Sequence, residues 1–118
     1  MRMLLAMCCL ALAYGMMPAP GLQAAEGDRQ IVEMTAQRFT YRPNKIHLHV
    51  GQAAELRIRA MDALHGFYIP KLNIRADLVP GTTVTIVLPP LAKGVYPFAC
   101  DVFCGTEHEQ MQGNLLVD

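Results

Sequence analysis

Four side chains with soft or borderline metal-binding atoms lie within one short segment near the C-terminus. The segment 99–113 reads A-C-D-V-F-C-G-T-E-H-E-Q-M-Q-G, and its candidate donors are Cys100, Cys104, His108 and Met111. Two thiolates, an imidazole and a thioether suit copper better than calcium, magnesium or manganese, which prefer oxygen ligands. Zinc accepts cysteine and histidine, but a thioether is a poor zinc ligand and a recurrent weak copper ligand. The spacing therefore predicts a copper site.

A single loop contributes only one side of a metal site, so a further donor must come from elsewhere in the chain. Gly105 follows the second cysteine directly and permits a tight loop. His65 lies among apolar neighbours in the segment D-A-L-H-G-F-Y-I-P, residues 62–70. An isolated histidine in such a setting is usually a hydrogen-bonded core residue. The downstream cluster favours a ligand role instead, and we predict that a loop carrying His65 completes the site.

The elements that must position these residues are short strands. Alternating or β-branched runs, separated by Pro and Gly turns, predict strands at 45–50, 54–60, 82–88, 94–99 and 113–117, with an edge strand at 31–37. The only stretch that favours a helix, 107–112, is too short to stand alone. This pattern predicts an all-β sandwich or barrel.

The N-terminal residues have the pattern of a secretory signal peptide. Arg2 precedes an apolar run, and a helix-breaking segment with small residues follows. We predict a signal peptide at 1–24 and one domain at 25–118, with a retained N-terminal anchor as the alternative. Cleavage would remove Cys8 and Cys9, leaving Cys100 and Cys104 as the only cysteines. Without Arg2, nine basic residues face ten acidic ones, and the sequence has no basic patch, so we predict no nucleic-acid partner.

Two segments carry a resemblance to a known family. D-A-L-H-G-F-Y-I-P and C-D-V-F-C-G-T-E-H-E-Q-M are similar to the CuA-binding cupredoxin domain of haem-copper oxidase subunit II and nitrous-oxide reductase. Shorter matches are A-Q-R-F-T-Y at 36–41, L-V-P-G at 78–81 and G-V-Y at 94–96. The resemblance extends over about 32–117 and implies a cupredoxin-like Greek-key β-sandwich.

The resemblance also implies a ligand set. In that family, two copper ions are bridged by two cysteine sulfurs, and weaker donors complete the site. The resemblance assigns these roles to matching residues of this chain. The bridging residues would be Cys100 and Cys104, and the terminal ligands would be His65 and His108. The weaker donors would be Met111 and the backbone carbonyl of Val102. Bridging thiolates delocalise one electron over two metals, which implies electron transfer by a protein that is not itself an enzyme.

Three departures from the oxidase subunits bear on the role. Those subunits usually have a glutamate, which reaches a magnesium ion, at the position of Val102. They often have a tryptophan for electron entry, whereas this sequence has none and places Phe39 and Tyr41 in the matching neighbourhood. They also carry a transmembrane hairpin ahead of the domain. We therefore expect a free-standing periplasmic carrier. Its partner would be a c-type cytochrome, a terminal reductase or a copper-delivery protein, with membrane contact only if the N-terminal segment is retained.

Other readings of the same residues stay open. A mononuclear type 1 copper carrier would use Cys104, His108, His65 and Met111. A Cu(I) chaperone would use the two thiolates and Met111, and an ordinary β-sandwich would use the cysteines as a structural disulfide. His47 and His49 fall on the polar face of their predicted strand and are expected to be solvated. Asp62 is expected either to orient its loop or the partner, or to form an Asx-turn.

Overall fold

The computed structural model describes residue 15 and residues 28–118 of the chain. Apart from Gly15, the predicted signal peptide lies outside the described residues. The described residues form nine strands and two short 3₁₀ helices. In chain order they are β1 (Gln30–Gln37), β2 (Thr40–Arg42), β3 (Lys45–Leu48), β4 (Ala54–Ala60), β5 (His65–Ile69), η2 (Pro70–Leu72), β6 (Ile74–Leu78), β7 (Thr83–Leu88), β8 (Gly94–Ala99), η3 (His108–Gln110) and β9 (Gln112–Val117). None of the helices found among these residues is long and apolar enough to cross a membrane.

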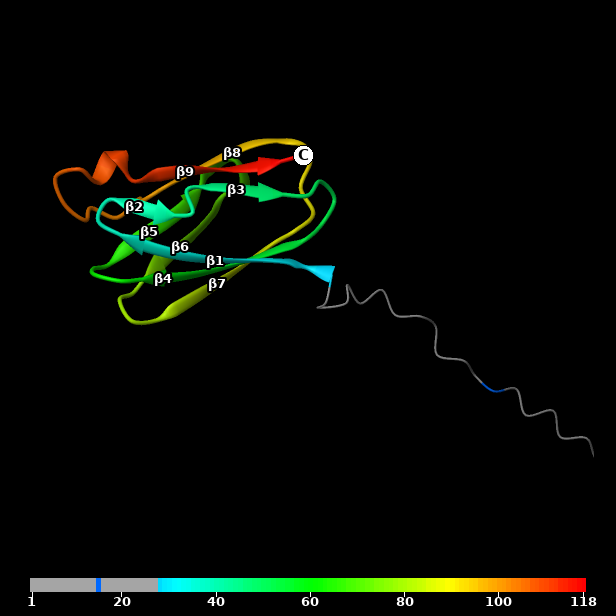
Figure 1. Cartoon of the computed structure of the whole chain (residues 1–118), viewed down its shortest axis with the longest axis horizontal. Helices are drawn as coiled ribbons and strands as arrows, with labels where there is room; N and C mark the ends of the chain where they lie inside the picture. Colours follow the sequence, from blue (N-terminus) through cyan, green and yellow to red (C-terminus); the bar gives the residue numbers. More distant parts are fainter. Residues whose placement is uncertain (1–14, 16–27) are drawn as a thin grey trace, which may run out of the picture.

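The strands form two sheets. One sheet has the order β2-β1-β4-β7 and the other the order β3-β9-β8-β5-β6 (Figure 1). Two neighbouring pairs, β1 with β4 and β3 with β9, are parallel, and the remaining pairs of strands are antiparallel. Strands that are distant in sequence are therefore neighbours in space, and the prediction of an all-β sandwich is confirmed.

The hydrophobic core lies between the sheets and follows from the alternation along the strands. In β4, Leu56 and Ile58 are buried, whereas Arg57 between them is only half-buried. Burying one such aliphatic side chain contributes roughly 1.5–3 kcal/mol. Three aromatic rings pack together in the core, those of Tyr41, Phe67 and Phe98, with centroids 4.8–5.8 Å apart. The Tyr41 hydroxyl donates to the carbonyl of Gly66 at 2.6 Å, which ties this cluster to the residue after His65.

The strand predictions were largely right where the pattern was regular. The five strands predicted without further qualification are present, with ends that differ by at most two residues. The prediction that 31–37 form an edge strand was wrong, because β1 lies between β2 and β4. The prediction that His65 lies in a loop was also wrong, since His65 is the first residue of β5. Strands β2, β5 and β6 were not predicted.

Candidate metal centre

The candidate donors near the C-terminus lie in the connection between β8 and β9, which we call the ligand loop (residues 100–111). Figure 1 shows this loop, in orange, at one end of the sandwich. Its base is closed by a hydrogen bond from the Cys100 amide to the Met111 carbonyl, at 3.1 Å. Gly105 has φ +146°, and a Cβ there would lie 2.7 Å from the ring of Phe39. Glycine therefore lets the loop pass close to the β1–β2 turn.

The ligand loop brings its sulfur and nitrogen atoms together. The two cysteine Sγ atoms are 3.9 Å apart, Cys104 Sγ lies 3.7 Å from His108 Nδ1, and it lies 4.0 Å from Met111 Sδ. Cys100 Sγ contacts the carbonyl oxygen of Val102 at 3.0 Å. Both cysteines and Met111 are buried, and His108 is half-buried.

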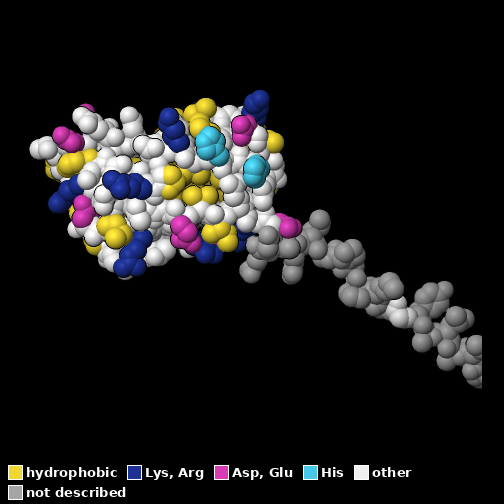
Figure 2. Space-filling view, viewed as in Figure 1, with side chains coloured by type: hydrophobic (Ala, Val, Ile, Leu, Met, Phe, Trp, Pro, Cys, Tyr) yellow, Lys and Arg dark blue, Asp and Glu magenta, His cyan; other side chains and the backbone are white. Residues whose placement is uncertain are grey.

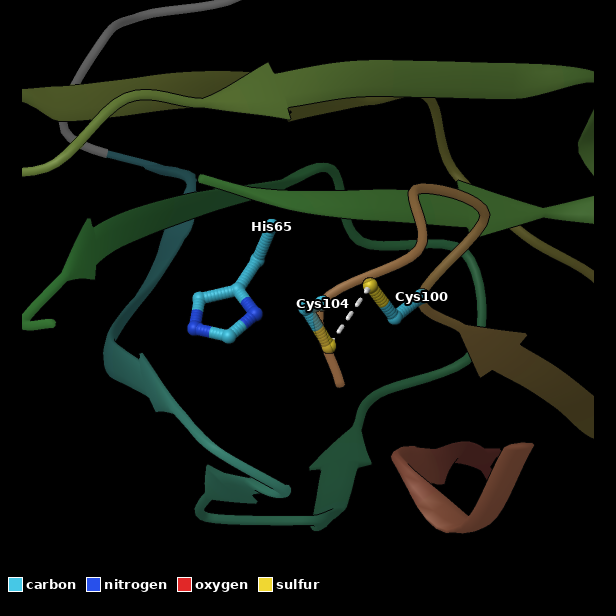
Figure 3. Close-up of side chains that lie close together, drawn as sticks. All are labelled: His65, Cys100 and Cys104. Atoms are coloured by element: carbon cyan, nitrogen blue, oxygen red, sulfur yellow. Dashed lines mark hydrogen bonds between the residues drawn. The ribbon is translucent and has the colours of Figure 1, made fainter. Parts of the chain in front are cut away.

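His65 completes the cluster from the start of β5. Metal-binding atoms of His65, Cys100 and Cys104 all lie within 4.8 Å of one another. The histidine side chain is fully buried, and its Nε2 is hydrogen-bonded to Asp62 Oδ1 at 2.7 Å. Its Nδ1 is buried and has no hydrogen-bond partner among the described residues. In Figure 3 the histidine ring turns one nitrogen toward the two cysteines. An orphaned buried nitrogen is costly unless something binds it, so this atom fits a metal ligand.

Asp62 orients the histidine from its far side. Its second oxygen, Oδ2, accepts the backbone N–H of Arg38 at 2.9 Å. Burial acts to raise the pKa of Asp62, but the hydrogen bonds from Arg38 and His65 outweigh it and lower this pKa. An ionised carboxylate on Nε2–H leaves Nδ1 as the free, basic nitrogen, which is a common arrangement at metal-binding histidines. Asp62 was expected to orient its loop or the partner, or to form an Asx-turn, and its contacts instead orient the His65 ring.

The cysteines form no disulfide in the described structure. Their sulfurs are much farther apart than the ~2.05 Å of a disulfide. They are still close enough for both to contact one ion, because a metal–thiolate bond is about 2.3 Å long. The Gly66 amide donates to Cys100 Sγ at 3.3 Å. Burial, together with the neighbouring Cys100, raises the pKa of Cys104 to about 11. A cation would offset the cost of two buried thiolates, so the donor set fits a soft metal ion.

One side of the cluster reaches the surface. Phe103 is 77% exposed, and its ring lies 5.8 Å from that of His108. A shallow hollow beside it is lined by Arg38, Ala63, Leu64, Phe103, Cys104 and Gly105. Tyr41, by contrast, is buried in the core, and Phe39 is half-buried. The exposed aromatic residue at this site is therefore Phe103 rather than Phe39 or Tyr41, the residues in the neighbourhood expected for electron entry.

The structure brings all six predicted donors into one cluster: His65, Cys100, Val102, Cys104, His108 and Met111. His47 and His49 are exposed, as predicted, and lie apart from it on and just after β3. On the face drawn in Figure 2, positive and negative side chains are interspersed, with no extended patch of one sign. The sequence did not indicate a role for Arg38. Its side chain binds the carbonyl oxygen of Cys104, 66 positions away, and such a contact leaves no local pattern.

Comparisons with known proteins agree with the fold and the cluster. The family model described as a cupredoxin-like domain matches residues 4–117. The alternative cytochrome c oxidase subunit 2 of Bradyrhizobium diazoefficiens is 32% identical over 73 residues, which are 62% of this chain and 26% of that protein. Cytochrome c oxidase subunit 2 of Thermus thermophilus is 29% identical over 100 residues, which are 85% of this chain and 74% of the relative. The match therefore spans about a quarter of the first relative's length and about three quarters of the second's.

A solved structure shows the same fold. The crystal structure of the periplasmic domain of subunit II of cytochrome oxidase from Bradyrhizobium japonicum superposes with a TM-score of 0.69 at 16% identity. The superposition covers 75% of this chain and 83% of that chain. The relatives thus include domains from oxidase subunits.

Proposed function

The chain belongs to the cupredoxin-like domain family, and we propose that it is a periplasmic copper-binding electron-transfer protein with a dinuclear CuA-type centre. The observation that carries this proposal is the buried, unpartnered Nδ1 of His65 beside two free, buried cysteines. A structural disulfide would explain neither the free thiols nor the orphaned nitrogen.

The donors divide by chemistry. Cys100 and Cys104 would bridge the two ions, and His65 and His108 would each bind one. Met111 Sδ and the Val102 carbonyl oxygen would be the weaker donors. Copper held by these residues would supply one-electron redox chemistry. The fold's part is to hold the donors in place, since the ligand loop is closed at its base and His65 is fixed by Asp62.

Electrons would cross at the exposed side of the site. His65 is fully buried, whereas His108 is half-buried beside the exposed Phe103 ring. We therefore place the contact with the redox partner at Phe103 and His108. The partner would be a c-type cytochrome, a terminal reductase or a copper-delivery protein. Glu107 and Glu109, both exposed in the ligand loop, would speed encounter with a basic partner.

Export would depend on residues 1–24 acting as a signal peptide, which leaves 25–118 as the mature domain. Intact-mass measurement of the protein recovered from the periplasm tests this step. A mass that begins at or near residue 25 supports cleavage, whereas the full-length mass supports a retained anchor.

Reconstitution of the mature protein with copper tests the function. We expect two copper ions per chain and an electron paramagnetic resonance signal with hyperfine coupling to two equivalent copper nuclei. One copper with the pattern of a single nucleus would contradict the dinuclear centre and favour a type 1 carrier. Binding of Cu(I) alone, with no coloured oxidised state, would favour a copper chaperone.

A further inference from the structure

Arg38 contacts both of the segments that supply donors to the metal centre. It lies in the turn between β1 and β2, at the end of the sandwich where the ligand loop lies (Figure 1). Its backbone N–H donates to Asp62 Oδ2, and its side-chain Nε–H donates to the carbonyl oxygen of Cys104, each at 2.9 Å. Since Asp62 also binds Nε2 of His65, Arg38 links the β5 side of the site to the ligand loop.

The two contacts of Arg38 differ in what they require. The backbone contact to Asp62 survives any substitution that keeps an amide hydrogen. The contact to Cys104 needs the side chain, because its donor is the guanidinium Nε–H. This carbonyl belongs to the backbone of Cys104, so the bond restrains the backbone from which the Cys104 side chain projects. The side chain of Arg38 therefore acts on the position of Cys104 Sγ.

The guanidinium also places a permanent positive charge beside the site. Arg38 lines the same hollow as Cys104, Leu64 and Phe103, and arginine remains charged at any accessible pH. A positive charge near a metal centre stabilises the state that has gained an electron. Its removal should therefore favour the oxidised state.

We propose that Arg38 is a positioning residue for Cys104 that also raises the reduction potential of the centre. This inference rests on the proposed function. Arg38 would not touch the metal and would act through Cys104 and through its charge.

Three variants separate these effects in the copper-loaded protein. Arg38→Gln removes the charge and shortens the side chain, and Arg38→Lys keeps the charge but lacks the planar Nε–H donor. Lys93→Gln is the matched control. It removes a positive charge at the opposite end of β8 from Cys100, about 20 Å away along the strand, which is beyond the ~8 Å Debye length at physiological ionic strength. Both substituted positions, 38 and 93, are exposed, so the fold should be unaffected.

The readouts are the reduction potential, the visible spectrum and the affinity for copper. Arg38→Gln is expected to lower the potential, to shift the absorption bands and to weaken copper binding about tenfold, at the lower end of what loss of an outer partner costs a metal site. Arg38→Lys is expected to shift the bands while keeping a potential near that of the wild type.

Two results would overturn the inference alone. One is an Arg38→Gln protein that loads copper and matches Lys93→Gln in potential and spectrum. The other is an Arg38→Lys potential as low as that of Arg38→Gln, which would remove the role of the charge. Failure of the wild-type protein to load copper would instead overturn the proposed function, and this inference with it.

Discussion

At the scale of single residues, the site depends on the orientation of His65. Asp62 has two acceptor oxygens and uses both, one for His65 Nε2 and one for the Arg38 amide. This pair of bonds directs Nδ1 toward the cysteines. That these sulfur and nitrogen atoms would lie close together could be predicted from the sequence, because cysteine, histidine and methionine at this loop spacing are rare. The residues that orient them could not, because their contacts depend on the folded chain.

Replacing Asp62 with asparagine tests this orientation. An amide has only one acceptor oxygen, so one of the two donors would face an NH₂ group and lose its bond. We expect copper affinity to fall about tenfold, measured by competition with a copper chelator. Glu107→Gln, which removes an exposed carboxylate from the ligand loop, is the control. Equal affinities for the two variants would contradict the role of Asp62.

Replacing Cys100 with serine tests the bridge. A hydroxyl is a harder and less readily ionised donor than a thiol, so it cannot replace a bridging thiolate. We expect the variant to bind at most one copper per chain and to lose the dinuclear spectrum, as judged by metal analysis and electron paramagnetic resonance. Met111→Leu removes only the weak donor and should keep two coppers with shifted bands. A dinuclear spectrum that persisted in the Cys100→Ser protein would rule out the bridging role.

At the scale of elements, the site lies where β5, the ligand loop and the β1–β2 turn meet. The strands with clean alternation, such as β4, were predicted within a residue or two. β5 was missed because four of its five residues are buried, which removes the alternation that marks a half-buried strand. β2 has only three residues and was too short to detect. The position of His65 in a strand, rather than in a loop, gives the site a rigid side.

The β8–β9 pair that carries the ligand loop is closely packed. Gly113 pairs with Phe98, and a Cβ there would lie 2.3 Å from the Asn44 carbonyl oxygen and 2.4 Å from the Phe98 ring. Overpacking of this kind costs typically 1–3 kcal/mol. We expect Gly113→Ala to lower the free energy of unfolding by about that amount in urea titrations. Gln112→Ala, at an exposed neighbour on β9, should change stability little. Equal free energies of unfolding for the two variants would show that the structure accommodates a Cβ at position 113 without loss of stability.

At the scale of the whole molecule, residues 28–118 share one hydrophobic core, which extends to Cys100, Cys104 and Met111 of the candidate metal centre. A ligand that binds only the folded state stabilises it by about 2.7 kcal/mol at a concentration 100 times its Kd. For a domain of this size, each kcal/mol raises the unfolding temperature by about 4–8 °C. The metal centre should therefore contribute measurably to the stability of the domain.

Metal removal tests that contribution. We expect copper loading to raise the unfolding temperature by roughly 10–20 °C relative to the chelator-treated protein, measured by circular dichroism. A Cys100→Ser, Cys104→Ser double variant should show little response to copper. If copper raised the unfolding temperature of the wild type no more than that of the double variant, copper would bind somewhere other than at Cys100 and Cys104.

X-ray absorption at the copper edge of the copper-loaded protein is the most direct test of the central claim, a pair of copper ions bridged by Cys100 and Cys104. The expected result is two sulfur neighbours per copper together with scattering from a second copper at short range. A single sulfur neighbour per copper, with no copper–copper scattering, would contradict the bridged centre.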